Sequence, residues 1–197
     1  MKYNILIIVS FYTIFIDARS LITKKNAIYQ DCKGTLCQNS KTLKLFSSIL
    51  NKLNIKEKIY LFETVKMQNH SACYNLPNKS IILNKHYWNS IPIIMQKMIL
   101  YHELRHHNQN KKVPNDTTKT VYEILQKQNF TLSQALEYDA DLFAAFKATN
   151  GCPVCLRFLK STANTGIDSR GYFTKHDFTQ LIKYAQIKNR LCSTHKK

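Results

Sequence analysis

The stretch MILYHELRHHNQ, residues 98–109, contains an H-E-x-x-H sequence that begins at His102 and ends at His106. On an α-helix, residues four positions apart share one face, so these two histidines can bind one metal ion. Glu103 lies beside that face, where its carboxylate can take a proton from a water molecule on the metal. The pattern predicts a zinc site with a glutamate general base, although so short a pattern also arises by chance.

A catalytic zinc site needs a third protein ligand. The metzincin solution is excluded, because Gln109 and Lys112 stand where that pattern has a glycine and its third histidine. The segment LSQALEYDADLFAA offers a carboxylate instead, since Glu137 and Asp141 are four positions apart and share a helix face. We predict that Glu137 is the third ligand. Asp141 can accept the ring N–H of a ligand histidine and orient it.

The acidic run EYDAD, residues 137–141, could instead be a solvated helix face. Two features favour the metal site. Apolar residues surround the run (Ala140, Leu142, Phe143, Ala144 and Ala145), and three of the chain's 12 acidic residues fall within it. Asp139 is predicted to point away from the shared face into solvent.

The combination of HELRH with EYDAD resembles the H-E-x-x-H … E-x-x-A-D pattern of the HtpX-like gluzincin metallopeptidases, including their soluble minigluzincin relatives. The stretch SACYNLPNKSIILNKHYW is similar to the A-x-x-L-P-x-x-x-I hairpin that leads into the zinc helix in that family. The resemblance covers about residues 65–150. It implies a zincin-like fold in which a small antiparallel or mixed sheet packs on an active-site helix and a glutamate-bearing helix.

Carried over residue by residue, the resemblance implies peptide-bond hydrolysis with Zn²⁺ as cofactor. In that chemistry zinc lowers the pKa of a bound water and polarises the scissile carbonyl, and the glutamate moves the proton. The matching residues are the zinc ligands His102, His106 and Glu137, the catalytic Glu103, and Asp141 as the partner of a ligand.

The chain departs from the family pattern in two ways. It lacks the transmembrane helices of the HtpX type, and it lacks a clear Thr-His-Pro after the second helix, where FTKHDF carries His176. A further hydrogen-bond donor should help to stabilise the oxyanion of the transition state. The candidates are His176, Tyr172 and Tyr184.

Two kinds of periodicity indicate how these residues are positioned. Residues 40–53 have helical spacing, residues 58–66 alternate as a strand, and residues 70–75 and 80–84 form a hairpin around LPNK. The strand Ile81, Ile82, Leu83 and Asn84 is predicted to be an exposed edge that binds an extended substrate by β-augmentation.

Capping patterns predict four helices after the hairpin. The first has Ser90 as N-cap and Pro92 in its first turn, and it runs to about Asn110. A capping box of Thr131 and Gln134 begins the next, which ends near Gly151. Pro153 begins a short helix, and Thr174 with Asp177 caps a last helix that reaches about Asn189. Strands followed by helices make the fold class α+β.

The first 18 residues are predicted to be a signal peptide. The apolar run from Ile5 to Ile16 is shorter than the roughly 20 residues needed to span a bilayer, and Ala18 suits cleavage. An uncleaved signal anchor is the alternative. We expect an N-terminal extension at 19–39, one metallopeptidase domain at 40–192 and a basic tail at 193–197. The mature chain should be exported, as a periplasmic or secreted protein, without a transmembrane helix.

The six cysteines of an exported chain indicate disulfides, although six cysteines allow 15 pairings. Close spacing favours Cys32 with Cys37 and Cys152 with Cys155, which leaves Cys73 and Cys192 for each other. A structural zinc held by the C-x4-C and C-x2-C pairs is the alternative.

The net charge of +17, from 29 basic and 12 acidic residues, predicts attraction to anionic surfaces. No nucleic-acid-binding motif accompanies the charge, so specific nucleic-acid binding is not expected. The expected partner is a peptide or protein substrate. The alternative function is a catalytically inactive, disulfide-bonded, basic binding protein that keeps the gluzincin fold. Retention of Glu103 favours the enzyme, because metal binding alone does not require it.

Overall fold

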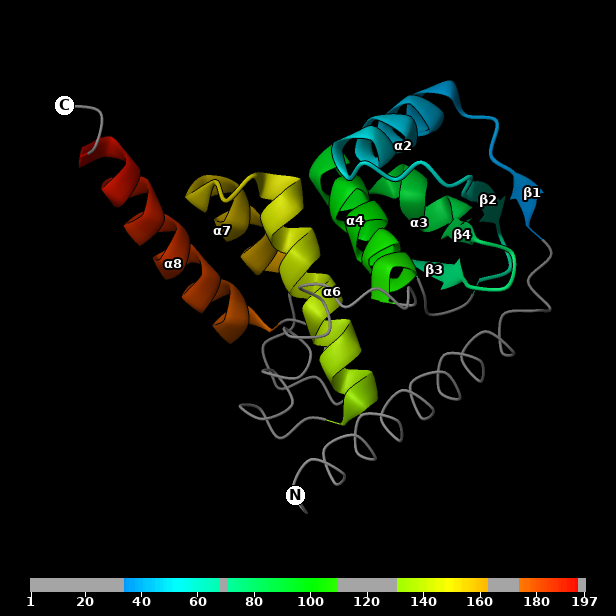
Figure 1. Ribbon diagram of the computed structural model, residues 1–197. Coiled ribbons are helices and arrows are strands. Elements are labelled where there is room, and N and C mark those ends of the chain that lie inside the picture. Colours follow the sequence, from blue (N-terminus) through cyan, green and yellow to red (C-terminus); the bar gives the residue numbers. More distant parts are fainter. Residues whose placement is uncertain (1–33, 68–70, 110–130, 163–173, 195–197) are drawn as a thin grey trace, which may run out of the picture.

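The computed structural model describes residues 34–67, 71–109, 131–162 and 174–194. In these residues the strands come first and most of the helices follow, which confirms the α+β class (Figure 1). The elements in chain order are β1 (Thr35–Leu36), α2 (Ser40–Lys52), β2 (Tyr60–Thr64), β3 (Ala72–Asn75), β4 (Ser80–Asn84), α3 (Lys85–Ser90), α4 (Ile93–Gln109), α6 (Leu132–Thr149), α7 (Pro153–Thr162) and α8 (Lys175–Thr194).

The four strands form one mixed sheet in the order β1-β2-β4-β3. The predicted hairpin is confirmed, because β3 pairs antiparallel with β4. The predicted strand at 58–66 is β2, which pairs parallel with β4. Strand β1 and this parallel pairing were not predicted, since neither a two-residue strand nor the partner of a strand is visible in local periodicity.

The prediction that Ile81–Asn84 forms an exposed edge is wrong. These residues belong to β4, which lies between β2 and β3 in the sheet. Ile81 is 0% exposed, Ile82 5% and Leu83 1%. An uninterrupted apolar run is typical of a strand covered on both faces, and it fits the interior of the sheet better than an edge. The strand at that end of the described sheet is β3, which packs against α4.

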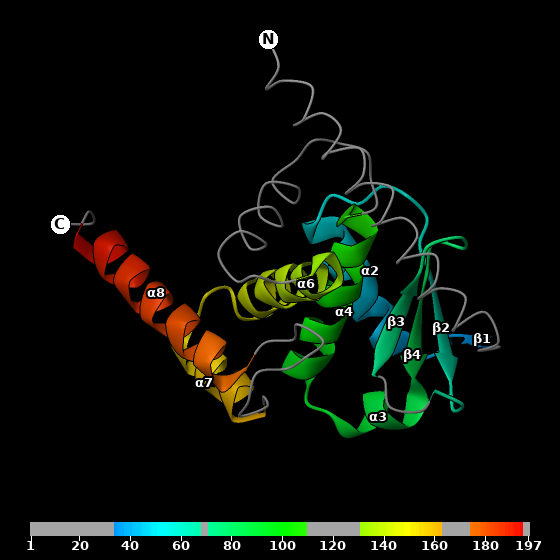
Figure 2. The ribbon, with the colours of Figure 1, turned by 90° about the horizontal axis from the view of Figure 1, so that it is seen from below.

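The larger apolar core lies between the sheet and the helices that cover it. Leu61 and Ile81 pack there with Phe46 of α2 and with Leu100 and Leu104 of α4. Helices α2 and α4 lie on the same side of the sheet (Figure 2). Helix α4, which carries the H-E-x-x-H motif, is therefore held against the sheet along one side.

Local capping explains where several helices begin and end. Asn39 Oδ1 accepts hydrogen bonds from the backbone N–H groups of Lys41 and Thr42 at the start of α2. The predicted capping box of Thr131 and Gln134 is present at the start of α6. That helix ends at Thr149, where the next two residues adopt positive φ, as the nearby glycine suggested.

The remaining caps are partly as predicted. Helix α7 begins at Pro153, and the Asp177 side chain accepts from the Thr174 backbone N–H at the start of α8. Ser90 is not an N-cap, because it is the last residue of α3, a short helix that Asn84 caps. The carbonyl of Pro92 accepts the first hydrogen bonds of α4 instead. Helix α8 extends past the predicted end, to Thr194.

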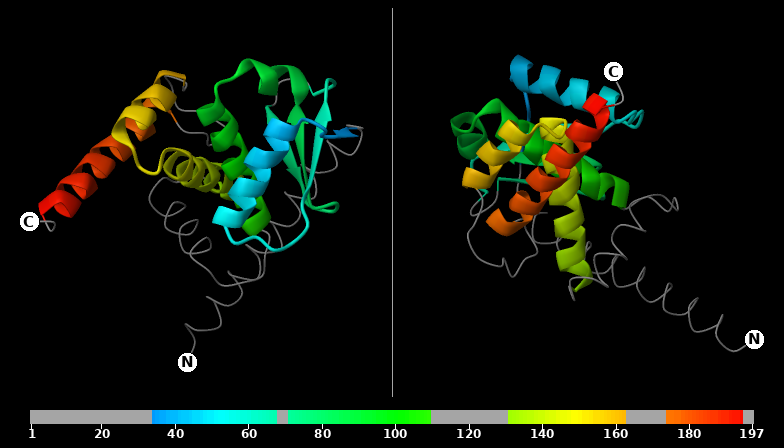
Figure 3. Two further views of the ribbon diagram at one scale, coloured as in Figure 1. Left: turned by 90° about the horizontal axis from the view of Figure 1, so that it is seen from above. Right: turned by 90° about the vertical axis from the view of Figure 1, so that its left-hand side faces the viewer.

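The helices form a row that begins at the sheet. Helix α4 lies between the sheet and α6, while α7 and α8 pack together on the far side of α6 (Figure 3). A second apolar cluster joins these last three helices through Ala145, Leu156, Leu159 and Phe178. The two clusters meet at α4 and α6, because Met98 packs against both clusters and Ala144 and Ala145 belong to one each.

Some predictions fall outside the described residues, including the signal peptide at 1–18 and most of the extension at 19–39.

Cys37, Cys152 and Cys155 are thiols, so the structure contains neither the Cys32–Cys37 nor the Cys152–Cys155 disulfide. The pair of Cys73 with Cys192 stays a prediction, because the Cys192 side chain is not described. No helix in the described ranges is long and apolar enough to cross a membrane.

Candidate metal centre

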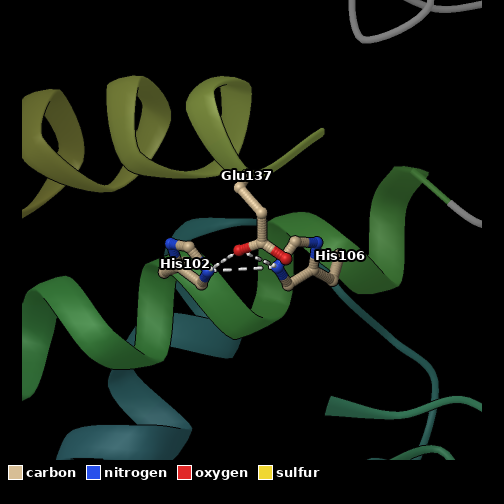
Figure 4. A group of neighbouring side chains, drawn as sticks. All are labelled: His102, His106 and Glu137. Carbon is tan, nitrogen blue, oxygen red and sulfur yellow. Dashed lines mark hydrogen bonds and ion pairs between the residues drawn. The ribbon is translucent and has the colours of Figure 1, made fainter. Parts of the chain in front are cut away.

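Helices α4 and α6 approach closely enough for their polar side chains to meet. Ala140 and Ala144 of α6 have no exposed surface, and Ala144 packs in the same cluster as Leu100 and Leu104 of α4. Small side chains let two helix backbones come close, so side chains of moderate length can reach across. The resulting contact brings Glu137 of α6 over the turn of α4 that carries the two histidines (Figure 4).

Three ligand atoms converge at this contact. The Nε2 atoms of His102 and His106 lie 3.0 Å apart. Glu137 Oε2 lies 3.2 Å from His102 Nε2 and 3.5 Å from His106 Nε2. A tetrahedral ion with bonds of about 2.0–2.1 Å requires its ligand atoms to lie about 3.3 Å from each other. The three atoms therefore have the spacing of one face of a tetrahedral zinc site, and two imidazoles with a carboxylate suit zinc chemically.

The electrostatics of the group favour a cation. Burial alone would lower the pKa of His102, but its hydrogen bonds to Asp141 and Glu137 outweigh burial and raise that pKa well above the ordinary value. Burial would raise the pKa of Glu137, but His106 and His102 hold it well below the ordinary value. Glu137 Oε2 lies beside His102 Nε2, so a proton and a metal ion would compete for that nitrogen.

Asp141 lies where its spacing predicts. Its Oδ1 is 2.8 Å from His102 Nδ1, on the opposite side of the ring from Glu137. A carboxylate at Nδ1 holds the ring proton there and leaves Nε2 for a metal ion. Since Asp141 is 8% exposed, solvent weakens this contact little. The geometry suits a residue that orients a ligand.

The prediction that Asp139 is solvated is wrong. Its side chain is 1% exposed, and its two carboxylate oxygens accept from Arg105 Nε at 2.8 Å and from an Arg105 terminal nitrogen at 3.0 Å. Gln109 also donates to Asp139, at 2.8 Å. A buried carboxylate needs such partners, and here they come from α4, 30 and 34 positions earlier in the chain.

Sequence reasoning missed Gln109 and Arg105 as parts of the site. Gln109 Oε1 lies 2.8 Å from His106 Nδ1, so the second histidine has an orienting partner as well. One signal was available, because Arg105 and Gln109 are four positions apart and share a face of the zinc helix. Their partner Asp139 could not be identified from spacing on α4 alone.

Glu103 follows His102 in the chain, and it is buried, with 6% of its surface exposed. Its negative charge contributes to the raised pKa of His102. It does not supply one of the three converging atoms. This position is compatible with proton transfer beside a metal ion.

Of the three oxyanion candidates, only His176 has a side chain that the structure describes. His176 is exposed in the first turn of α8, where its Nε2 lies 3.3 Å from Gln180 Nε2. Its neighbour Asp177 accepts a hydrogen bond from Tyr138, the residue after Glu137, at 3.0 Å. The start of α8 is thus hydrogen-bonded to α6 at the residue after Glu137. Tyr172 and the side chain of Tyr184 lie outside the described part of the chain.

Comparison with known proteins adds no family assignment. No protein-family model, curated protein or solved structure matches this chain. The resemblance to gluzincins therefore depends on the motifs, and the metal centre depends on the geometry of its own residues.

Proposed function

We propose that this chain is an exported zinc-dependent endopeptidase of the HtpX-like gluzincin type. The observation that carries the proposal is the convergence of His102 Nε2, His106 Nε2 and Glu137 Oε2 within 3.0–3.5 Å of one another. Three protein ligands with a glutamate beside them are typical of catalytic zinc sites, which leave further positions for water and substrate. A purely structural zinc site uses four protein ligands and needs no such glutamate.

In the proposed reaction each residue has one task. His102, His106 and Glu137 hold the zinc ion, which when bound activates a water molecule and polarises the scissile carbonyl. Glu103 accepts the proton of the attacking water and donates it to the nitrogen of the leaving amine. Its burial keeps the carboxylate out of bulk water.

The test of the function is cleavage of a peptide library by the zinc-loaded mature chain. We expect cleavage to stop when a chelator removes zinc and to return when zinc is restored, since the activated water depends on the metal. A mature chain that carries one zinc ion, lacks residues 1–39 and leaves the whole library intact would contradict the enzyme and support the binding protein.

A further inference from the structure

We infer that Gln109 holds His106 in its metal-binding tautomer, and that Asp139 and Arg105 hold Gln109 in place. This inference rests on the proposed metal site, but it does not depend on the reaction. It gives the second histidine ligand a positioning residue that the H-E-x-x-H and E-x-x-A-D motifs do not contain.

The orientation of the Gln109 amide is fixed by its neighbours. One end of the amide lies 3.0 Å from the Leu136 carbonyl oxygen and 2.8 Å from Asp139 Oδ2. The Leu136 carbonyl can only accept, and both carboxylate oxygens of Asp139 already accept hydrogen bonds from Arg105. The end that meets two acceptors must be the NH₂ group. The amide oxygen is therefore the atom that faces His106.

This orientation determines the proton on His106. The Gln109 amide oxygen carries no hydrogen, so the 2.8 Å contact requires His106 Nδ1 to be the donor. A neutral His106 with its proton on Nδ1 has its lone pair on Nε2. That lone pair faces Glu137 Oε2 and His102 Nε2, where a metal ion would bind.

Gln109 is held from behind by a buried ion pair. Arg105 is 5% exposed and Asp139 1%, and the guanidinium also lies 4.8 Å from the centre of the Phe143 ring. Because Arg105 and Gln109 are one helical turn apart, both reach Asp139 from the same face of α4. The contact sequence runs from Arg105 through Asp139 and Gln109 to His106 without a gap.

An amide suits this position better than a carboxylate. Glu103, Glu137 and Asp141 already place three acidic groups at the site. A fourth carboxylate at 109 would stand 2.8 Å from Asp139, where like charges repel. The amide supplies both an acceptor for His106 and donors for Asp139, which a carboxylate cannot do.

The experiment replaces Gln109 with methionine, which keeps the length of the side chain and removes both hydrogen-bonding ends. Gln96→Met is the matched control, because Gln96 lies on the same helix and donates a hydrogen bond to the Trp88 carbonyl away from the site. Two-bond ¹H–¹⁵N spectra of the zinc-free chain report the tautomer of His106. Competition with a chromophoric chelator reports zinc affinity.

We expect wild type and Gln96→Met to show His106 protonated at Nδ1, and Gln109→Met to show a mixture with the Nε2 tautomer. Zinc affinity should fall by about 10–100-fold in Gln109→Met alone. Gln109→Glu should also lower affinity, by repelling Asp139. An unchanged tautomer in Gln109→Met, or equal losses of affinity in both methionine variants, would overturn the inference. A wild type that binds no zinc would refute the proposed function, while the spectra would still decide the role of Gln109.

Discussion

Replacing Glu103 with glutamine is expected to lower peptide-bond hydrolysis by at least about 100-fold while the zinc content stays at the wild-type value. Glutamine keeps the shape of the buried side chain and removes the carboxylate that accepts a proton. General-base catalysis typically contributes about 10²–10⁴-fold to the rate, and it acts on the transition state rather than on metal binding. The measurements are zinc stoichiometry, melting temperature and turnover of one peptide substrate, made on the same preparations.

A matched control for this variant is Glu63→Gln. Glu63 is also a partly buried glutamate, but it lies on β2 and pairs with Lys85 at 3.2 Å. That change should leave turnover near the wild-type rate. If Glu103→Gln lost its zinc as well as its turnover, Glu103 would be part of the metal site, and its assignment as the proton acceptor would be wrong.

The second large effect is expected at Glu137, the ligand that α6 contributes. Removing the carboxylate in Glu137→Ala leaves two histidine ligands, so zinc affinity should fall by more than the roughly 10–100-fold typical for loss of an outer hydrogen-bond partner. Asp141→Ala provides that smaller effect for comparison, because Asp141 contacts His102 at Nδ1, on the far side of the ring from the three converging atoms. Competition with a chelator of known affinity measures both.

The order of these two effects separates a ligand from an orienting residue. Added zinc should raise the melting temperature of wild type strongly, that of Asp141→Ala less at the same zinc concentration, and that of Glu137→Ala least. Equal zinc affinity in wild type and Glu137→Ala would show that α6 contributes no ligand, and the gluzincin proposal would lose its main support.

Local elements could be predicted from the sequence where a local rule determines them. The capping box at Thr131, the proline start of α7 and the hairpin around LPNK depend on residues a few positions apart. The order of strands depends on pairings between segments distant in sequence, and no periodicity specifies a partner. The apolar character of Ile81–Leu83 was visible, but whether it faced substrate or the sheet interior was decided by the parallel pairing with β2.

In the candidate site, too, the residues that a local rule determines could be predicted, and those that depend on distant contacts could not. Spacing within one helix identified His102 with His106 and Glu137 with Asp141, because helical geometry turns four positions into one face. Asp139 was misjudged, since its place on the helix says nothing of the arginine that neutralises it from α4. Gln109 was seen only as a departure from another zinc motif, because its importance depends on two contacts across the helix pair.

The two helices together define a pattern that is more informative than the motif it contains. On α4 the proposed metal ligands 102 and 106 alternate with the pair 105 and 109, and on α6 Glu137, Asp139 and Asp141 occupy every second position. The combined pattern is H-E-x-R-H-x-x-Q followed by E-x-D-x-D. Each added position lowers the number of chance matches by roughly the number of amino-acid types. A protein found with both halves should have the same crossed helices, and a protein that has lost the arginine should also have lost the middle acid, which is Asp139 in this chain.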